Sequence, residues 1–455
     1  MMAQLQRTVA IAGGGLAGLA AGCALADSGY RVQLFERRPY LGGRASSYQH
    51  PATGEVVDNC QHVLLGCCTN LLDLYQRSGV LDQVRWFEEL NFIEPGGRIS
   101  IIGPSFLPEP FHTSPSFLKA HALSVADKTA VARAMLSLLG EVPDDGKPFL
   151  EWLRRHGQTQ RAIDRFWNVV LVSALNEDLD RVSTRYAALV FRESFLKSRE
   201  AGRMGIPTVP LTQLYSAAGR YIEERGGEVR LRASVDSFTA DDNGVKLSVA
   251  GNEVCADLAV LALPFNTLQQ VLPEEPNHAG LRGMLAHFES SPITGIHLWF
   301  DRKVTELDHA VLLDRTIQWM FNKSRLQGRK DEGSYLELVV SSSKSLVEKP
   351  KQEIVDIAMR ELAEFFPVVA QAKLVKSTVI KEVHATYSPK PGVDGYRPGA
   401  ESVWPRVFLA GDWTATGWPA TMEGAVRGGY LAAEAIAGKK FLVRDLQARG
   451  LMRWL

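Results

Sequence analysis

Apolar and polar positions at the beginning of the chain follow the order of a strand, a turn, a helix and a second strand. Residues 8–12 form a short apolar, partly β-branched run, and the glycine-rich segment 13–18 follows at once. An Ala- and Leu-rich stretch continues to Asp27, and a second apolar run over 31–36 ends on Glu36. This order predicts the start of a parallel sheet, and therefore an α/β domain.

The middle of the chain has helical spacing of aromatic and aliphatic residues. Between about residues 90 and 200, segments such as 149–153 and 165–171 place aromatic side chains on one face, which predicts helices of an inserted substrate domain. Residues 117–139 also have apolar helical spacing, and we expect them to be buried in the core. Two further helices are predicted at 212–225 and 353–366.

The remaining apolar runs predict strands. Residues 228–235 and 244–249 alternate as antiparallel strands do, whereas 258–264 is continuous, as expected for a buried strand that returns to the nucleotide-binding sheet. Further strands are predicted at 295–300, 335–340 and 407–412, and a last helix at 420–437.

These elements assign both ends of the chain to one domain. We expect a discontinuous, Rossmann-like cofactor-binding domain made of residues 1–85, 203–285 and 380–455. The inserted α+β substrate domain is expected to comprise residues 86–202 and 286–379.

Composition narrows the class of protein. The 455 residues are 45% hydrophobic and 22% charged, which excludes a disordered chain. Lys and Arg equal Asp and Glu at 51 each, so the general positive field that nucleic-acid binding uses is absent and no nucleic-acid partner is predicted. Five cysteines without a C-x-x-C pair indicate neither a disulfide framework nor a metal site. With no export signal and no run of 18 apolar residues, a cytoplasmic protein is expected.

The glycine-rich segment has the chemistry of a dinucleotide site. Gly13 permits the tight turn, Gly15 lets the backbone approach a pyrophosphate, and Gly18 lets the helix pack closely on the sheet. The first helical residues, Leu16 and Ala17, place backbone N–H groups next to the phosphates. Glu36, 18 residues after Gly18, can accept hydrogen bonds from ribose hydroxyls and would repel a 2′-phosphate despite the adjacent Arg37. NAD and FAD therefore remain as the candidate cofactors.

Two features favour FAD. Residues 37–44 form a second glycine turn that contains Gly43 and Arg44, which can extend the pyrophosphate site. Far along the chain, a buried strand ends on Gly411 and Asp412, which suits a carboxylate on ribityl hydroxyls. The helix that follows would direct its N-terminus at the pyrimidine edge of a flavin, and its candidate contacts are Thr421, Met422 and Ala425. No cysteine follows Cys255, so a thioether link from this motif is excluded and the FAD is expected to be non-covalent.

These motifs resemble the flavin amine oxidase and phytoene desaturase superfamily. Segments 58–66 and 411–425 more narrowly resemble its squalene-associated branch, the hydroxysqualene dehydroxylases of bacterial hopanoid synthesis; residues 427–429 depart from the branch, where Ser-Gly is frequent. The resemblance implies that Gln61 and His62 lie beside the isoalloxazine ring and that Val235 contacts the adenine side.

The resemblance also implies a reaction. It is the reductive removal of the hydroxyl from hydroxysqualene to give squalene, on a long-chain isoprenoid substrate and in association with other squalene-pathway enzymes. Gln61 and His62 are the catalytic candidates, because a histidine can exchange a proton at neutral pH. The alternative for His62 is plain core packing, and Glu423 is expected to cap its helix. The alternative functions are a carotenoid or phytoene-type desaturase, an amine oxidase, and a non-catalytic flavin carrier.

The C-terminal segment 439–455 interleaves apolar residues with five basic residues and one acid. Such a pattern suits a segment that lies on anionic lipid, which would place the protein peripherally at the inner face of the membrane. Packing of the segment onto its own domain is the alternative, and the one that we favour.

Overall fold

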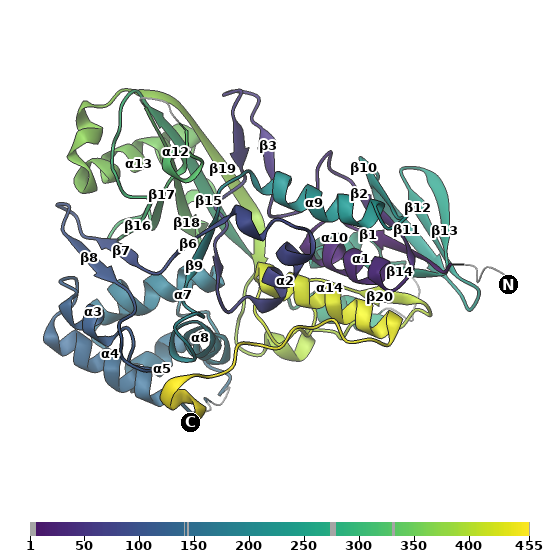
Figure 1. Ribbon diagram of the computed structural model, residues 1–455, viewed down its shortest axis with the longest axis horizontal. Coiled ribbons are helices and arrows are strands. Elements are labelled where there is room, and N and C mark those ends of the chain that lie inside the picture. Colours follow the sequence, from purple (N-terminus) through teal and green to yellow (C-terminus); the bar gives the residue numbers. More distant parts are fainter. Residues whose placement is uncertain (1–5, 141, 143–144, 274–278, 330–332, 455) are drawn as a thin grey trace.

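The computed structural model describes residues 6–140, 142, 145–273, 279–329 and 333–454. Figure 1 shows two halves along the longest axis: one built on a parallel sheet near the N-terminus, the other on a large mixed sheet with a group of helices. The predicted α/β architecture, a Rossmann-like domain with a second, mixed domain, is confirmed.

The parallel sheet has the strand order β10-β2-β1-β14-β20. Its strands are Thr8–Ala12 (β1), Arg31–Glu36 (β2), Glu228–Leu231 (β10), Leu258–Leu261 (β14) and Val407–Leu409 (β20). Every residue of β14, and all but the first residue of β1, is buried, as expected for central strands covered on both faces. The sheet therefore joins the beginning, the middle and the end of the chain, as the apolar runs predicted.

Three helices stabilise this sheet. They are Leu16–Asp27 (α1), Leu211–Glu223 (α9) and Met422–Ala437 (α14), and α1 contacts both of the others. Helix α14 comes so close to α1 that a Cβ on Gly429 would lie 2.2 Å from Ala17 O. The two motifs at opposite ends of the chain are therefore held side by side.

The expectation of antiparallel pairing over residues 228–235 is wrong. Strand β10 pairs in parallel with β2 at the edge of the sheet, and all of its residues are half-buried or exposed. Arg232, at φ 56°, separates it from the next strand. The antiparallel partners of 244–249 are instead found in a sheet of Val235–Ala240 (β11), Val245–Val249 (β12) and Asn252–Ala256 (β13).

A seven-stranded sheet forms the centre of the second half, in the order β19-β15-β18-β17-β16-β7-β8. Helix Lys351–Phe365 (α13) packs against it through a shared apolar core. The strands are Leu90–Ile93 (β7), Ile99–Ile102 (β8), Ser290–Phe300 (β15), His309–Leu312 (β16), Trp319–Asn322 (β17), Ser334–Ser341 (β18) and Leu374–Tyr387 (β19). Two of them, β7 and β8, lie where we expected only helices. Strand β7 pairs with β16, more than 200 residues away, and β8 pairs with β7 at the edge of the sheet.

The helical part of this half has an aromatic core. Phe149, Trp152, Trp167 and Phe191 pack against one another in stacked and edge-to-face pairs. Its elements are Ser114–Lys119 (α3), Val125–Ser137 (α4), Phe149–Arg155 (α5), Gln160–Ala162 (α6), the π-helical turn Ile163–Trp167 (η2), Asn168–Leu175 (α7), Thr184–Phe191 (α8) and the π-helical turn Arg192–Leu196 (η3). Burial of segment 117–139 is confirmed only in part, because Val131 and Ala134 are buried whereas Leu118 and Leu136 are exposed.

Further short elements lie outside the two large sheets. They are Ser47–Gln49 (β3), Val56–Asp58 (β4), Leu64–Leu65 (β5), Thr69–Arg77 (α2), Val84–Phe87 (β6), Met204–Pro207 (β9), Phe265–Val271 (α10), Ala279–Leu285 (α11) and Lys323–Leu326 (α12). Within the described residues, no helix is both long enough and apolar enough to cross a bilayer.

Candidate cofactor and substrate site

A cavity of about 830 Å³ lies where the two halves meet. The residues predicted from the sequence to contact the cofactor line it together, with one exception. Those in the lining are Gly13, Gly15, Leu16, Ala17, Glu36, Arg37, Gly43, Arg44, Gln61, His62, Val235, Gly411, Asp412, Thr421, Met422 and Ala425. The exception is Gly18, which lies beneath the turn: a Cβ there would be 1.9 Å from Gly13 O, so glycine is required for close packing of α1 on the sheet.

The first glycine turn is built to receive an anion. Gly13 has a φ of 108°, which glycine adopts without strain. Gly15 precedes α1 in an extended conformation, and no side chain caps the helix. The N–H groups of the first helical turn have no intrahelical partners, and Gly15, Leu16 and Ala17 line the cavity. A pyrophosphate fits this turn, since its charge would be stabilised by the helix dipole.

Glu36 is fixed at the end of β2 by the backbone around it. Its Oε2 accepts a hydrogen bond from Gly14 N–H at 2.8 Å, and its Oε1 accepts one from Arg38 N–H at 2.8 Å. A carboxylate has further lone pairs, so Glu36 can still accept from ribose hydroxyls. The second glycine turn lies against the first, because Gly42 N–H donates to Gly14 O at 2.9 Å.

An ion pair connects this second turn to the C-terminal motif. Arg44 Nη2 lies 2.5 Å from Asp412 Oδ1, and the side chain of Asp412 is buried. Beside it, Thr421 caps α14, because its hydroxyl accepts a hydrogen bond from Gly424 N–H at 3.1 Å. Residues 368 positions apart thus form one wall of the cavity, as an FAD site assembled from both ends of the chain requires.

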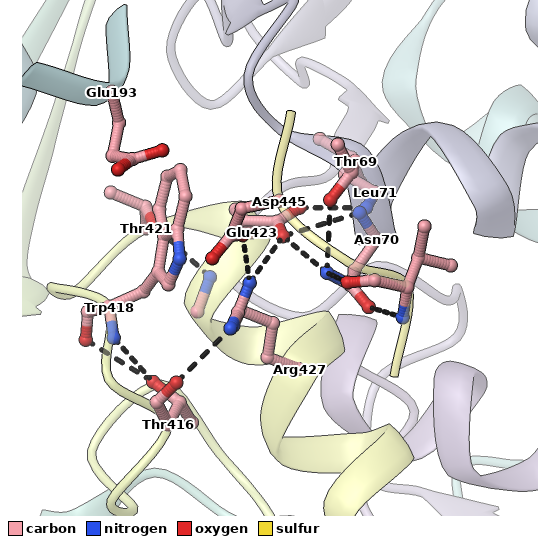
Figure 2. Close-up of polar contacts among 12 residues, drawn as sticks. Thr69, Asn70, Leu71, Glu193, Thr416, Trp418, Thr421, Glu423, Arg427 and Asp445 are labelled. Carbon is pink, nitrogen blue, oxygen red and sulfur yellow. Dashed lines mark hydrogen bonds and ion pairs between the residues drawn. The ribbon is translucent and has the colours of Figure 1, made fainter. Parts of the chain in front are cut away.

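The position of Glu423 in the first turn of α14 predicted that it would cap this helix, and that prediction is wrong. Its carboxylate accepts instead from Leu71 N–H at 2.8 Å and from Asn70 Nδ2 at 2.8 Å, at the start of α2 (Figure 2). Burial raises the pKa of this carboxyl group. The residue therefore ties α14 to α2, and Thr421 provides the cap.

Gln61 and His62 lie in the cavity wall between the two halves. Gln61 Oε1 accepts from Lys323 Nζ at 2.8 Å, and Gln61 Nε2 donates to His62 O at 3.0 Å. His62 Nδ1 lies 2.8 Å from Cys60 O, and since a carbonyl only accepts, Nδ1 carries the proton. Burial lowers the pKa of His62. The imidazole is therefore neutral near pH 7, with Nε2 left as an acceptor.

Behind Gln61 lies a charged cluster that the sequence analysis missed. Lys323 Nζ is 2.7 Å from Asp58 Oδ2 and 3.4 Å from Glu337 Oε2, and all three side chains are buried. Burial favours neutral Asp58, but Lys323 and Ser47 hold the pKa of Asp58 below its usual value. Burial raises the pKa of Glu337 to about 8, against the attraction of Lys323. The available signal was Glu337 itself, an acid in the middle of an otherwise apolar strand.

The tryptophan and cysteine residues of the motifs have packing roles in the core and in the cavity wall. Trp413 is buried with its indole N–H donating to Leu263 O at 2.9 Å, whereas Trp418 lines the cavity. Cys60, Cys67 and Cys68 also line it, and burial raises the pKa of Cys60, which makes its thiol unreactive.

The remaining part of the cavity is apolar. Its wall comes from the second half of the molecule and consists mainly of aliphatic and aromatic side chains: Leu90, Phe92, Val169, Val170, Leu189, Val190, Phe195, Val311, Trp319, Phe321 and Val339. The sequence predicts a substrate domain here, but its apolar pattern does not single out these side chains. Two carboxylates from this half of the molecule also line the cavity: Glu193 in the helical part of the wall, and Glu382 on β19.

Three comparisons with known proteins agree with this arrangement. Residues 16–437 match the family described as flavin containing amine oxidoreductase. The chain is 29% identical to 15-cis-phytoene desaturase of Synechococcus elongatus, covering 95% of this chain and 96% of that protein. It is 28% identical to the 15-cis-phytoene desaturase of Capsicum annuum, covering 94% of this chain and 77% of that protein. The fold is similar to that of cyclohexylamine oxidase from Brevibacterium oxydans, with a TM-score of 0.69 and 19% identity over 95% of this chain and 99% of that one.

Proposed function

Since this chain belongs to the family of flavin-containing amine oxidoreductases, and is an FAD-dependent oxidoreductase, we propose that it acts on a long-chain isoprenoid, as a desaturase of the carotenoid type. The observation that carries the proposal is the cavity itself. Its dinucleotide end continues into an apolar wall from α7, α8 and the seven-stranded sheet. A hydrocarbon chain suits such a wall because its binding buries apolar surface, and because the chain itself has no polar group that would need a hydrogen-bond partner. The phytoene desaturases that the chain resembles support the same class of substrate.

The proposed cofactor contacts follow the order of the turns along the cavity. Gly13, Gly15, Leu16 and Ala17 would hold the pyrophosphate, with Arg37, Gly43 and Arg44 beside it; Glu36 would hold the ribose and Val235 the adenine side; Gly411 and Asp412 would hold the ribityl chain, and Thr421, Met422, Ala425, Gln61 and His62 the flavin ring. Bound without a covalent link, FAD supplies hydride transfer. The protein orients the substrate and excludes water.

His62 is proposed to handle the proton. Desaturation removes a hydride and a proton from neighbouring carbons, so it needs a proton acceptor. Because Nδ1–H is directed at Cys60 O and burial lowers the pKa of His62, the free nitrogen is an acceptor near pH 7. Gln61 is proposed to position this segment through its hydrogen bond with Lys323.

The second candidate is reductive dehydroxylation of hydroxysqualene to squalene. It is favoured by the sequence of segments 58–66 and 411–425, which resemble the squalene-associated branch. This reaction requires a proton donor for the leaving hydroxyl, a role that a neutral His62 fills less well. In this case, association with other squalene-pathway enzymes would be expected.

One paired experiment separates the two candidates. The purified holoenzyme is incubated anaerobically with phytoene in the oxidised state, and with hydroxysqualene after reduction of the flavin. Flavin reduction with a desaturated product, seen by absorbance and mass spectrometry, is the result expected from the first proposal. Squalene with reoxidised flavin would establish the second candidate instead. A Gly15→Val variant, which blocks the pyrophosphate turn, serves as the control for reactions of free flavin.

We propose that the protein contacts a membrane through the end of its C-terminal segment together with a neighbouring loop, and not through the basic residues alone. Most of segment 439–455 packs on its own chain: Asp445 pairs with Arg427 at 2.7 Å, and Arg449 N–H donates to Lys197 O at 2.9 Å. Leu455 lies outside the described residues. The exposed apolar side chains at the end of this segment, Leu451 and Trp454, adjoin the loop that contains Phe106, because Leu451 N–H donates to Glu109 O. This combined surface is the proposed contact with a bilayer that holds the substrate.

The division into a cofactor domain of residues 1–85, 203–285 and 380–455 and a substrate domain of residues 86–202 and 286–379 also stays a proposal. Strand β19, which passes through residue 380, belongs to the seven-stranded sheet and carries side chains of the cavity wall. Limited proteolysis of the holoenzyme would test these boundaries.

A further inference from the structure

Glu193 is placed in the cavity by an irregular turn of helix. In η3, Lys197 N–H donates to Arg192 O, five residues earlier, at 3.0 Å. Such a π-turn inserts one extra residue and is frequent at functional sites. Here three consecutive residues, Glu193, Ser194 and Phe195, line the same cavity. In Figure 2, Glu193 extends toward Trp418 and Thr421, which precede the first turn of α14.

The other carboxylates of the cavity lining have different positions or partners. Among the described residues, they are Glu36, Asp236, Glu382, Asp412 and Glu423. Glu36, Asp412 and Glu423 bind the backbone, Arg44 and α2 respectively, as described above. Asp236 is an exposed residue of β11, and Glu382 lies on β19. Glu193 is therefore the carboxylate that belongs to the helical, apolar wall.

Lys197 holds the Glu193 carboxylate in place from one side. Its Nζ lies 2.7 Å from Oε2, and both side chains are only partly accessible, at 21% and 15%. An ion pair of this kind restricts the rotamer of the carboxylate. A fixed negative charge in an apolar wall has no use in binding a neutral hydrocarbon. It is useful where positive charge develops, since fixed charges act strongly where water is excluded.

Both candidate reactions develop positive charge on the isoprenoid chain. Departure of a hydride from a carbon next to a double bond leaves an allylic cation, and so does departure of a hydroxyl group before a hydride arrives. We propose that Glu193 is the carboxylate that stabilises this allylic cation. The inference rests on the isoprenoid substrate class of the proposed function, but it holds for either direction of the reaction.

The test is equilibrium binding of a cation mimic, without turnover. Geranylgeranylamine carries a positive charge at neutral pH, and geranylgeraniol is its neutral counterpart. Their dissociation constants with the holoenzyme are measured in the same detergent by quenching of tryptophan fluorescence, since Trp319 and Trp418 line the cavity. The native protein is expected to bind the amine on the order of tenfold or more tightly than the alcohol.

Glu193→Gln is expected to abolish this preference and to leave the affinity for the alcohol nearly unchanged. Glu200→Gln is the matched control, because Glu200 pairs with Arg449 and is not in the cavity lining.

Two results would overturn the proposal. One is a preference for the amine that survives in Glu193→Gln; the other is a preference that disappears in Glu382→Gln instead, which would assign the role to the β19 carboxylate. If the native protein binds neither ligand, the isoprenoid substrate class itself is wrong. That outcome is distinct from binding of the alcohol with no gain for the amine, which contradicts the role of Glu193 alone.

Discussion

At the scale of single residues, the buried ammonium of Lys323 connects stability to the site. It is surrounded by Asp58 and Glu337, and it donates to Gln61 in the cavity wall. The buried carboxylate of Asp58 is tolerated only while that cation is present, because an uncompensated buried charge is costly. The same side chain therefore stabilises the fold and positions Gln61.

Replacement of Lys323 by Met tests this connection. We expect Lys323→Met to lower the free energy of unfolding by about 3–5 kcal/mol, the cost of breaking a buried ion pair from one side. Denaturant unfolding followed by tryptophan fluorescence measures the change. Lys440→Met is the matched control: Lys440 also pairs with a glutamate, but its side chain is 92% exposed, and little change is expected. Equal effects of the two variants would contradict this account of the cluster.

Glu337 makes the stability depend on pH. Burial raises the pKa of Glu337 to about 8, whereas the unfolded chain loses this proton near its ordinary pKa of about 4.3. The native state thus binds the extra proton between these values, and its stability falls as the pH rises through that window. Glu337→Gln removes the titration, so its gain in melting temperature over the native protein should be larger at pH 8 than at pH 5. An equal gain at both pH values would show that Glu337 is already ionised in the native state at the lower pH.

At the scale of elements, the close contact of α1 with the sheet depends on Gly18. A Cβ at this position would lie 1.9 Å from Gly13 O, so Gly18→Ala must shift either the helix or the turn. We expect a loss of about 1–3 kcal/mol in stability, the typical cost of overpacking, together with weaker retention of FAD. The ratio of flavin to protein absorbance after gel filtration measures the second effect.

A matched glycine makes this result specific. Gly280 lies in α11, and among the described residues no atom lies within 4 Å of a Cβ built there. Gly280→Ala should therefore retain FAD fully and leave stability unchanged or slightly increased, because Ala favours helix over Gly. Loss of FAD in both variants would indicate a general sensitivity of the fold instead of a contact at Gly18.

The elements were predictable where the determinants are local. The first strand, helix and second strand, with Glu36 at the end, follow from apolar periodicity and from the spacing of glycines, and the structure has them at the expected residues. Strands β7 and β10 were misassigned because their pairing partners are distant in sequence. The motif residues of the cavity were predictable because their spacing in the sequence is local. Lys323 and the apolar wall were not, because their roles depend on side chains that only the folded chain brings together.

At the scale of the whole molecule, the C-terminal segment crosses from one half to the other. Figure 1 shows it leaving α14, at the parallel sheet, and ending beside the helices of the second half. Asn70 binds it at Val443, Arg427 at Asp445, and Leu446 packs with Trp418 and Cys67. Two of its basic residues also form ion pairs within the chain, Lys440 with Glu434 and Arg449 with Glu200. The exposed apolar side chains at its end have no such contact within the described part of the chain and are free for an interaction with lipid.

This distribution predicts which residues determine membrane binding. Phe106 is 93% exposed and Trp454 is 86% exposed, and the loop and the tail that carry them are joined at Glu109. Transfer of such side chains into the interfacial region of a bilayer is favourable by roughly 1.5–3 kcal/mol for each that is fully buried. The double variant Phe106→Ser, Trp454→Ser should therefore sediment with anionic vesicles at least about tenfold less than the native protein.

The charge and the apolar residues make separable contributions to this binding. Added salt weakens only the electrostatic part, so the native protein should keep a salt-resistant fraction that the double variant lacks. Val403→Ser removes an apolar side chain that is 62% exposed just before β20, in the other half of the molecule, and should sediment as the native protein does. If Val403→Ser and the double variant lose binding equally, the contact is not localised at the loop and the tail. If binding is abolished entirely by salt, the basic residues alone account for it, and the exposed aromatic side chains have another role.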